Sequence, residues 1–163
     1  MKLVMKTTSD IVRQLEKGEE VFFLPELSEW EEFQSKYDLL AKRLSYEFNP
    51  IWAWFKYAGY QANVNLYKTL QTQDEFMYTH VMLIEVPDKL VTLSNFHLWD
   101  DFLVSDEDVL TECIFDVENA TQVQATFPTL KPEYVLQVSE IVKETKTSFS
   151  YSKLTELYAE LGI

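Results

Sequence analysis

The residues that could take part in chemistry begin with an aromatic cluster. Trp52, Trp54 and Tyr57 lie in the run Ile-Trp-Ala-Trp-Phe-Lys-Tyr at 51–57. On a strand, side chains two positions apart point to the same face, so Trp52 and Trp54 are expected to lie side by side. Core packing alone explains such a pattern. The alternative is an aromatic wall on which a base, a sugar or a nicotinamide ring stacks.

A second candidate site is acidic. The stretch between Leu90 and Leu130 has no lysine or arginine, and this charge would attract basic surfaces and repel nucleic acid and anionic membranes. Within it, Asp108, Glu112 and Asp116 recur every four residues. On a helix they would form a stripe with a spacing close to that of phosphates along a nucleic-acid strand. We expect either an ordinary solvated face or a face that mimics nucleic acid toward a basic protein partner.

The remaining reactive residue types give no catalytic signature. His97, Asp100 and Asp101 have the spacing to converge on zinc or manganese, but solvated aspartates are the favoured explanation, and no metal site is predicted. Cys113 lies on the apolar face of a predicted helix and is expected to be an inert core thiol. The three glycines lie too far apart for a phosphate-binding glycine-rich loop.

Composition limits the class of protein. A chain of 163 residues with 47% hydrophobic and 15% aromatic residues is long enough for one core, so we predict a single domain over residues 1–163. The net charge of −13 favours solubility. One cysteine excludes a disulfide within the chain and is typical of the cytoplasm. The sequence has neither a recognisable signal peptide nor an apolar run of the roughly 20 residues that a membrane span needs.

Hydrophobic periodicity alternates between strand-like and helix-like segments. Strands are predicted at 3–6, 51–57, 80–86, 90–93, 122–127 and 134–142. Helices are predicted at 9–18, at 29–46 after a capping box of Ser28 and Glu31, after Ser94 or Asn95, after Ser105, and from Ser150 or Ser152 to the end. Residues 59–74 are polar without clear period and are predicted to be a loop or flap. The fold class is therefore α+β, with a mixed or antiparallel sheet and interleaved helices.

Three segments carry a resemblance to a family. They are Pro50-Ile51-Trp52-Ala53-Trp54, Leu93-Ser94-Asn95-Phe96-His97-Leu98-Trp99, and Gln124-Ala125-Thr126-Phe127 with Glu133-Tyr134-Val135 beyond. Their order and spacing resemble the bacterial and phage family known as domain of unknown function 3841. The chain departs from that pattern at Val4, where members carry tryptophan, and at Asn95, where they tend to carry aspartate. The resemblance implies a fold and no agreed activity.

The chain also resembles ADP-ribosyltransferase-like folds. These open with a strand, a helix and a glycine, as residues 3–18 would, and carry a late pair of strands like 122–125 and 132–135. Such enzymes place a histidine or arginine at the end of the first strand, where this chain has Lys6 and Thr7. They place a glutamate in the late strand, where this chain has Gln124. The resemblance therefore implies the architecture without the catalytic residues.

These observations predict a protein that acts by binding. The candidate pocket consists of Thr7, Trp52, Trp54, Tyr57 and Gln124, and it would take a nucleotide-like small molecule without a resident cofactor. The first alternative is an enzyme that uses NAD for ADP-ribosyl transfer, with Gln124 orienting the ribose. The second alternative is an acidic inhibitor or adaptor that binds a basic protein through Asp108, Glu112 and Asp116.

Overall fold

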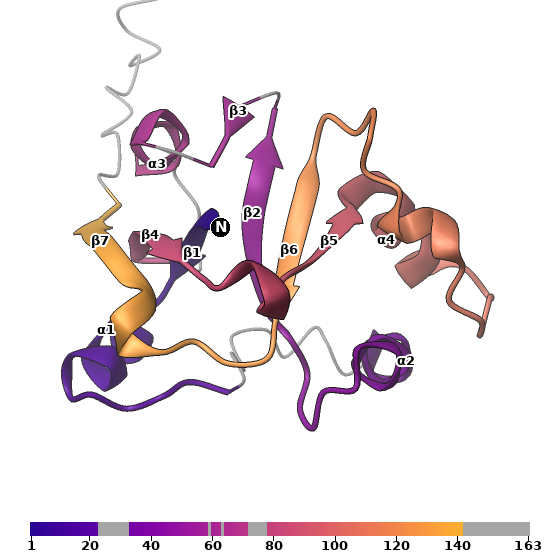
Figure 1. Cartoon of the computed structure of the whole chain (residues 1–163), viewed down its shortest axis with the longest axis horizontal. Helices are drawn as coiled ribbons and strands as arrows, with labels where there is room; N and C mark the ends of the chain where they lie inside the picture. Colours follow the sequence, from indigo (N-terminus) through magenta and orange to yellow (C-terminus); the bar gives the residue numbers. More distant parts are fainter. Residues whose placement is uncertain (23–32, 59, 63, 72–77, 142–163) are drawn as a thin grey trace, which may run out of the picture.

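The computed structural model describes residues 1–22, 33–58, 60–62, 64–71 and 78–141 (Figure 1). In these residues the strands are β1 (Lys2–Thr7), β2 (Ile51–Tyr57), β3 (Tyr60–Gln61), β4 (His80–Glu85), β5 (Thr92–Asn95), β6 (Val123–Phe127) and β7 (Val135–Glu140). The helices are α1 (Ser9–Glu16), α2 (Gln34–Leu44), α3 (Val64–Gln71) and α4 (Phe96–Val104). Short 3-10 turns occupy Asp88–Leu90, Glu112–Phe115 and Pro132–Tyr134. The predicted α+β class is confirmed.

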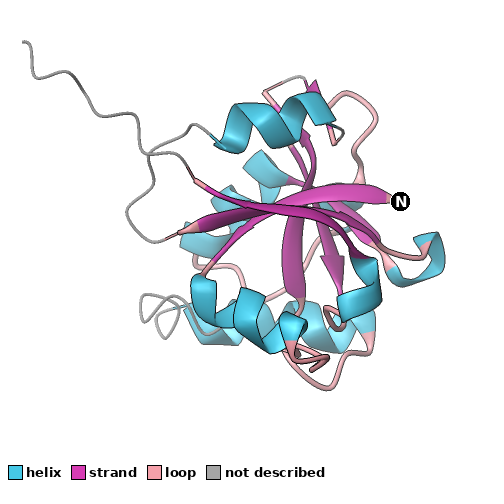
Figure 2. Cartoon of the chain, turned by 90° about the vertical axis from the view of Figure 1, so that its left-hand side faces the viewer, coloured by secondary structure: helices cyan, strands magenta, loops and turns pink. Residues whose placement is uncertain are grey.

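All these strands belong to one antiparallel sheet with the order β5-β6-β2-β1-β4-β7, and β3 pairs with the end of β2. The sheet is almost divided at its centre. β1 pairs with β4 along its whole length, from Lys2 opposite Glu85 to Thr7 opposite His80. With β2 it shares the single pair Val4 and Trp54. The two halves of the sheet therefore diverge on either side of this pair (Figures 1 and 2).

Alternation along β1 sends side chains to two different cores. Leu3 and Met5 are buried in a cluster that includes α1 and Phe127 of β6. Val4 points to the other face and packs in a cluster with α3. A third cluster joins α2, α4 and the turn at Glu112–Phe115, with Trp99 at 2% exposure near its centre. The helices thus cover both faces of the sheet (Figure 2).

One correction concerns residues 59–74, which were predicted to be a loop or flap. In the described part of this segment the chain forms β3 and then α3. Leu66, Tyr67 and Leu70 are all buried against β1 and β4. Their spacing of one and four residues is that of a helix face, but the asparagines and glutamines around them hid this period in the sequence.

A second correction concerns the helix predicted after Ser105. The structure has only the short 3-10 turn Glu112–Phe115, and Cys113 is exposed and not a core residue. The Ser105 hydroxyl donates to the Phe102 carbonyl oxygen at 2.8 Å and accepts from the Glu107 amide at 3.2 Å, which ends α4 and turns the chain. Carboxylates four residues apart repel each other on a helix, so the charges of this segment also disfavour a helix here.

Other predictions of local structure have mixed outcomes. Asn95 does cap α4, because its side-chain oxygen accepts from the Leu98 amide at 3.4 Å. β5 begins two residues later than predicted, since Pro87 is followed by the turn Asp88–Leu90. The predicted capping box and the predicted final helix lie outside the described residues. None of the described helices is long and apolar enough to span a membrane.

Candidate functional site

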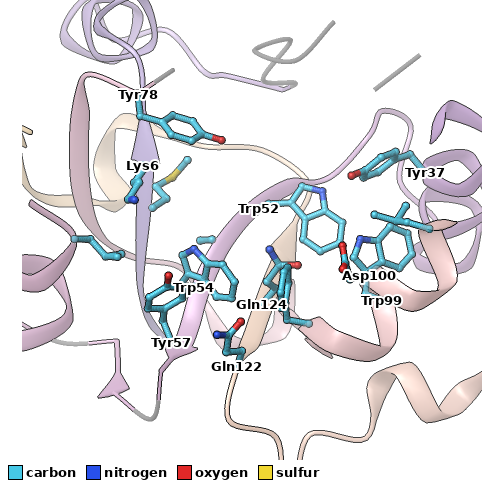
Figure 3. Close-up of a pocket in the computed structure, with 15 residues that line it drawn as sticks. Lys6, Tyr37, Trp52, Trp54, Tyr57, Tyr78, Trp99, Asp100, Gln122 and Gln124 are labelled. Atoms are coloured by element: carbon cyan, nitrogen blue, oxygen red, sulfur yellow. The ribbon is translucent and has the colours of Figure 1, made fainter. Parts of the chain in front are cut away.

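A cavity of about 470 Å³ lies where β1 and β2 diverge. Its walls come from the end of β1, the strands β2 and β6, the helices α2, α3 and α4, and Tyr78 just before β4 (Figure 3). A volume of this size falls in the range of about 300–1,000 Å³ that is typical of small-molecule sites. The cavity is therefore a candidate site for a small molecule.

Aromatic rings form much of the cavity wall. Trp52 and Trp54 both line it, as expected for two side chains on one face of β2. The Trp54 ring lies 4.8 Å from Tyr57 and 5.3 Å from Phe96, measured between ring centroids. The Trp52 ring lies 5.3 Å from Trp99 of α4. Each tryptophan is thus supported by neighbouring rings, which holds it in place without help from a ligand.

Four side chains with polar groups line the cavity beside these rings. Gln122 immediately precedes β6, and Gln124 is the second residue of that strand. Gln124 is paired directly opposite Trp54 of β2. Lys6 contributes from β1 and Asp100 from α4. Two neutral amides, one ammonium group and one carboxylate therefore surround a mainly aromatic space, an arrangement suited to orienting a planar ligand by hydrogen bonds.

A buried tyrosine, Tyr37, also lines the cavity. Burial raises the pKa of Tyr37 to about 12; a hydrogen bond with Trp99 opposes the rise, and the charges of Asp100 and Tyr78 add to it. The Tyr37 phenol is consequently neutral throughout the physiological pH range. It lies on α2, 5.6 Å from the Trp99 ring between centroids.

Thr7 is not brought to this cavity, although it was a candidate pocket residue. It is fully buried and does not line the cavity, whereas Met5, which shares its face of β1, and Lys6, which lies on the other face, both do. The Thr7 carbonyl oxygen accepts from the Thr79 amide at 3.0 Å, while the Thr7 hydroxyl finds no hydrogen-bond partner in the described part of the chain. The residue before it, Lys6, takes the place at the pocket that the sequence assigned to Thr7.

The unpartnered hydroxyl makes Thr7→Val a test of this placement. Valine has nearly the same shape and removes a buried polar group, so we expect the free energy of unfolding to rise by up to about 1 kcal/mol, measured by urea denaturation. Thr126→Val is the matched control: the Thr126 hydroxyl is also buried, but it donates to the Thr92 carbonyl oxygen at 3.3 Å. That variant should lose about 1 kcal/mol. A larger loss at Thr7 than at Thr126 would contradict the assignment.

The three acidic candidates do not form a helical stripe. Glu112 is held by a two-pronged ion pair with Arg43 of α2, with oxygens 2.9 and 3.0 Å from one guanidinium nitrogen. One carboxylate oxygen of Asp116 accepts from the Glu118 amide at 3.2 Å, and Asp108 is exposed. The geometry that suggested a nucleic-acid mimic is therefore absent, and partner binding by these residues stays a prediction.

The metal alternative gains no support from the arrangement of side chains. Among the described residues no three of the types His, Cys, Asp and Glu come together in a way that could hold an ion. His97 instead packs its ring 5.4 Å from that of Phe96, and Asp100 lines the aromatic cavity.

Several lining residues were missed by sequence reasoning. Gln122 precedes Gln124 by two residues, so the same alternation that paired Trp52 with Trp54 could have found it. No comparable signal existed for Tyr37 or Trp99, because each fits the core face of its own helix. Only the packing of α2 and α4 against β2 brings these rings to the cavity.

Comparison with known proteins adds no relative on which to base an assignment. No protein-family model matches the chain, and no curated protein or solved structure matches it at a significant level. The resemblance to domain of unknown function 3841 and that to ADP-ribosyltransferase-like folds therefore stay predictions.

Proposed function

We propose that this protein binds a planar, nucleotide-like small molecule in the cavity between β1 and β2. The observation that carries the proposal is the convergence of Trp52, Trp54 and Gln124 on one cavity of about 470 Å³. An aromatic ring of the ligand would stack on the indoles, because flat π faces attract each other in offset or edge-on arrangements. The proposal requires no catalytic group.

The two glutamines would provide the polar part of recognition. Each amide offers both donors and an acceptor, so Gln122 and Gln124 can match the edge of a base or a carboxamide without placing a charge in the site. Gln124 sits on β6 between β2 and β5, where the strand ladder holds its backbone on both sides. A group on a rigid strand is better positioned for specificity than one on a loop.

The NAD-dependent transferase remains a second candidate. Two positions that the resemblance singled out, the end of the first strand and the late strand, place Lys6 and Gln124 on the same cavity. The opening order of strand, helix and glycine is also present, since Gly18 follows α1 with a positive φ of 81°. Gln124 can hydrogen-bond a ribose hydroxyl but cannot act as an acid, so we place ligand binding ahead of group transfer.

We propose in addition that the protein works in the cytoplasm and belongs to the family known as domain of unknown function 3841. The single cysteine, Cys113, supports the first proposal, because cytoplasmic chains have little use for disulfides. The three sequence segments that carry the resemblance support the second.

Thermal unfolding with and without millimolar NAD or AMP tests the proposed function. A ligand at about 100 times its dissociation constant adds about 2.7 kcal/mol of stability, which for a chain of this size raises the unfolding temperature by roughly 5–11 °C. Gln124→Ala should abolish that rise, while Thr7→Val should preserve it because Thr7 lies outside the cavity. No rise with either nucleotide, or a rise that survives Gln124→Ala unchanged, would overturn the proposal.

A further inference from the structure

The charged groups of the cavity lie on different walls. Asp100 belongs to α4, and Lys6 belongs to β1. In Figure 3 the Asp100 carboxylate lies beside Trp52 and Trp99, and Lys6 lies on the other side of the view beyond Trp54. A ligand in this cavity therefore meets a negative group at one end and a positive group at the other, so its own charges determine which way round it binds.

Three aromatic rings, those of Tyr37, Trp52 and Trp99, pack together beside Asp100. The centroid of the Trp52 ring is 6.1 Å from that of Tyr37 and 5.3 Å from that of Trp99. Trp99 and Tyr37 are 2% and 6% exposed, so they form a rigid backing, while half-buried Trp52 faces the cavity. The effect of Asp100 on the Tyr37 pKa agrees with a carboxylate close to these rings.

We propose that Asp100 and Trp52, backed by the buried ring of Trp99, form a subsite for a positively charged head group of the ligand, such as a pyridinium or another organic cation. This inference rests on the proposed function and specifies the chemistry of the ligand. The negative face of an indole attracts cations more strongly than other side-chain rings do, and a carboxylate at the rim adds direct charge pairing. The ammonium group of Lys6 directs the cation toward the α4 end.

The charge of the whole protein acts in the same direction. The net charge of −13 gives a field that draws cations toward the surface, and Asp100 is exposed at the cavity. Such steering weakens as ionic strength rises, because the Debye length falls to about 10 Å at 0.1 M salt. A cationic ligand should therefore bind more weakly as salt is added, whereas a neutral analogue should show little dependence.

The test compares 1-methylnicotinamide, a cation, with nicotinamide, its neutral counterpart of almost the same shape. Binding is followed by quenching of tryptophan fluorescence at low salt. We expect the cation to bind about tenfold more tightly, the factor that corresponds to about 1.4 kcal/mol. Asp100→Asn should reduce this preference to twofold or less. Asp101→Asn is the matched control, since it removes the same charge from a neighbouring exposed residue that does not line the cavity.

The outcomes separate the inference from the function on which it rests. Equal binding of the two probes, or a preference that Asp101→Asn reduces as much as Asp100→Asn does, would overturn the cation subsite and leave the proposed function standing. If neither probe binds but NAD or AMP raises the unfolding temperature, the cation subsite is again overturned and the proposed function stands. If no nucleotide and neither probe binds, both proposals fail.

Discussion

Replacing Trp99 by alanine is expected to lower the free energy of unfolding by about 3–5 kcal/mol, the cost of truncating a large buried aromatic side chain. Trp99 is 2% exposed, and its ring centroid lies within 5.7 Å of those of Tyr37, Trp52 and Phe102. It thereby joins α4 to α2 and to β2. Since these contacts also build one side of the cavity, the variant should lose ligand binding together with stability.

Urea denaturation followed by circular dichroism would measure this loss. Leu98→Ala is the matched control, because Leu98 precedes Trp99 on the same helix and is 36% exposed. Its loss should stay below about 1 kcal/mol. If Trp99→Ala cost no more than Leu98→Ala, the cluster of α2, α4 and β2 would not be packed as described, and the wall around Asp100 would lose its basis.

Leu66→Ala is expected to have the second large effect, a loss of about 2–5 kcal/mol in the free energy of unfolding. Leu66 is fully buried in the cluster that packs α3 against β1 and β4, together with Val4 and Val81. Truncation would leave a cavity between the helix and the sheet, and closely packed protein interiors close such a cavity only in part. A solvated loop at this position would show almost no effect.

Lys68→Ala provides the control within the same helix, because Lys68 is exposed two residues further on. A surface change of this kind should alter stability by no more than about 0.5 kcal/mol, and alanine favours the helix. Equal effects of the two substitutions, in thermal or urea unfolding, would mean that residues 64–71 do not pack on the sheet and that the sequence-based loop was the better description.

The sequence was most informative where the local pattern and the final environment agree. β2 and β4 are central strands with dense apolar or aromatic runs, and both appear where predicted. Asn95 signals the start of α4 because a side-chain oxygen at that position satisfies a free backbone amide whatever lies nearby. Such features depend on neighbours in the chain, so one sequence is enough to find them.

Prediction failed where the deciding interaction is distant in sequence. α3 carries enough polar residues to obscure its period, and its three buried residues gain their partners from strands distant in sequence, β1 and β4 among them. Conversely, the acidic segment after Ser105 has helical spacing, but its Ile114 is buried against α2 and α4 in a short 3-10 turn. Tertiary contacts of this kind outweigh weak local preferences, which differ by only a few tenths of a kcal/mol per residue.

The sequence by itself determined the α+β class and the strand carrying Trp52 and Trp54, because alternation and hydrophobic period are properties of adjacent residues. Gln124 was singled out by the resemblance to ADP-ribosyltransferase-like folds and not by such a pattern. Only the tertiary structure decided that Met5 and Lys6 reach the cavity and Thr7 does not, because the cavity opens where β1 parts from β2 beyond the pair of Val4 and Trp54. The tertiary structure also brought Asp100 and Trp99 of α4 to the cavity, because the cavity forms where β1 and β2 diverge and α2 and α4 pack beside the gap. No local pattern encodes that separation.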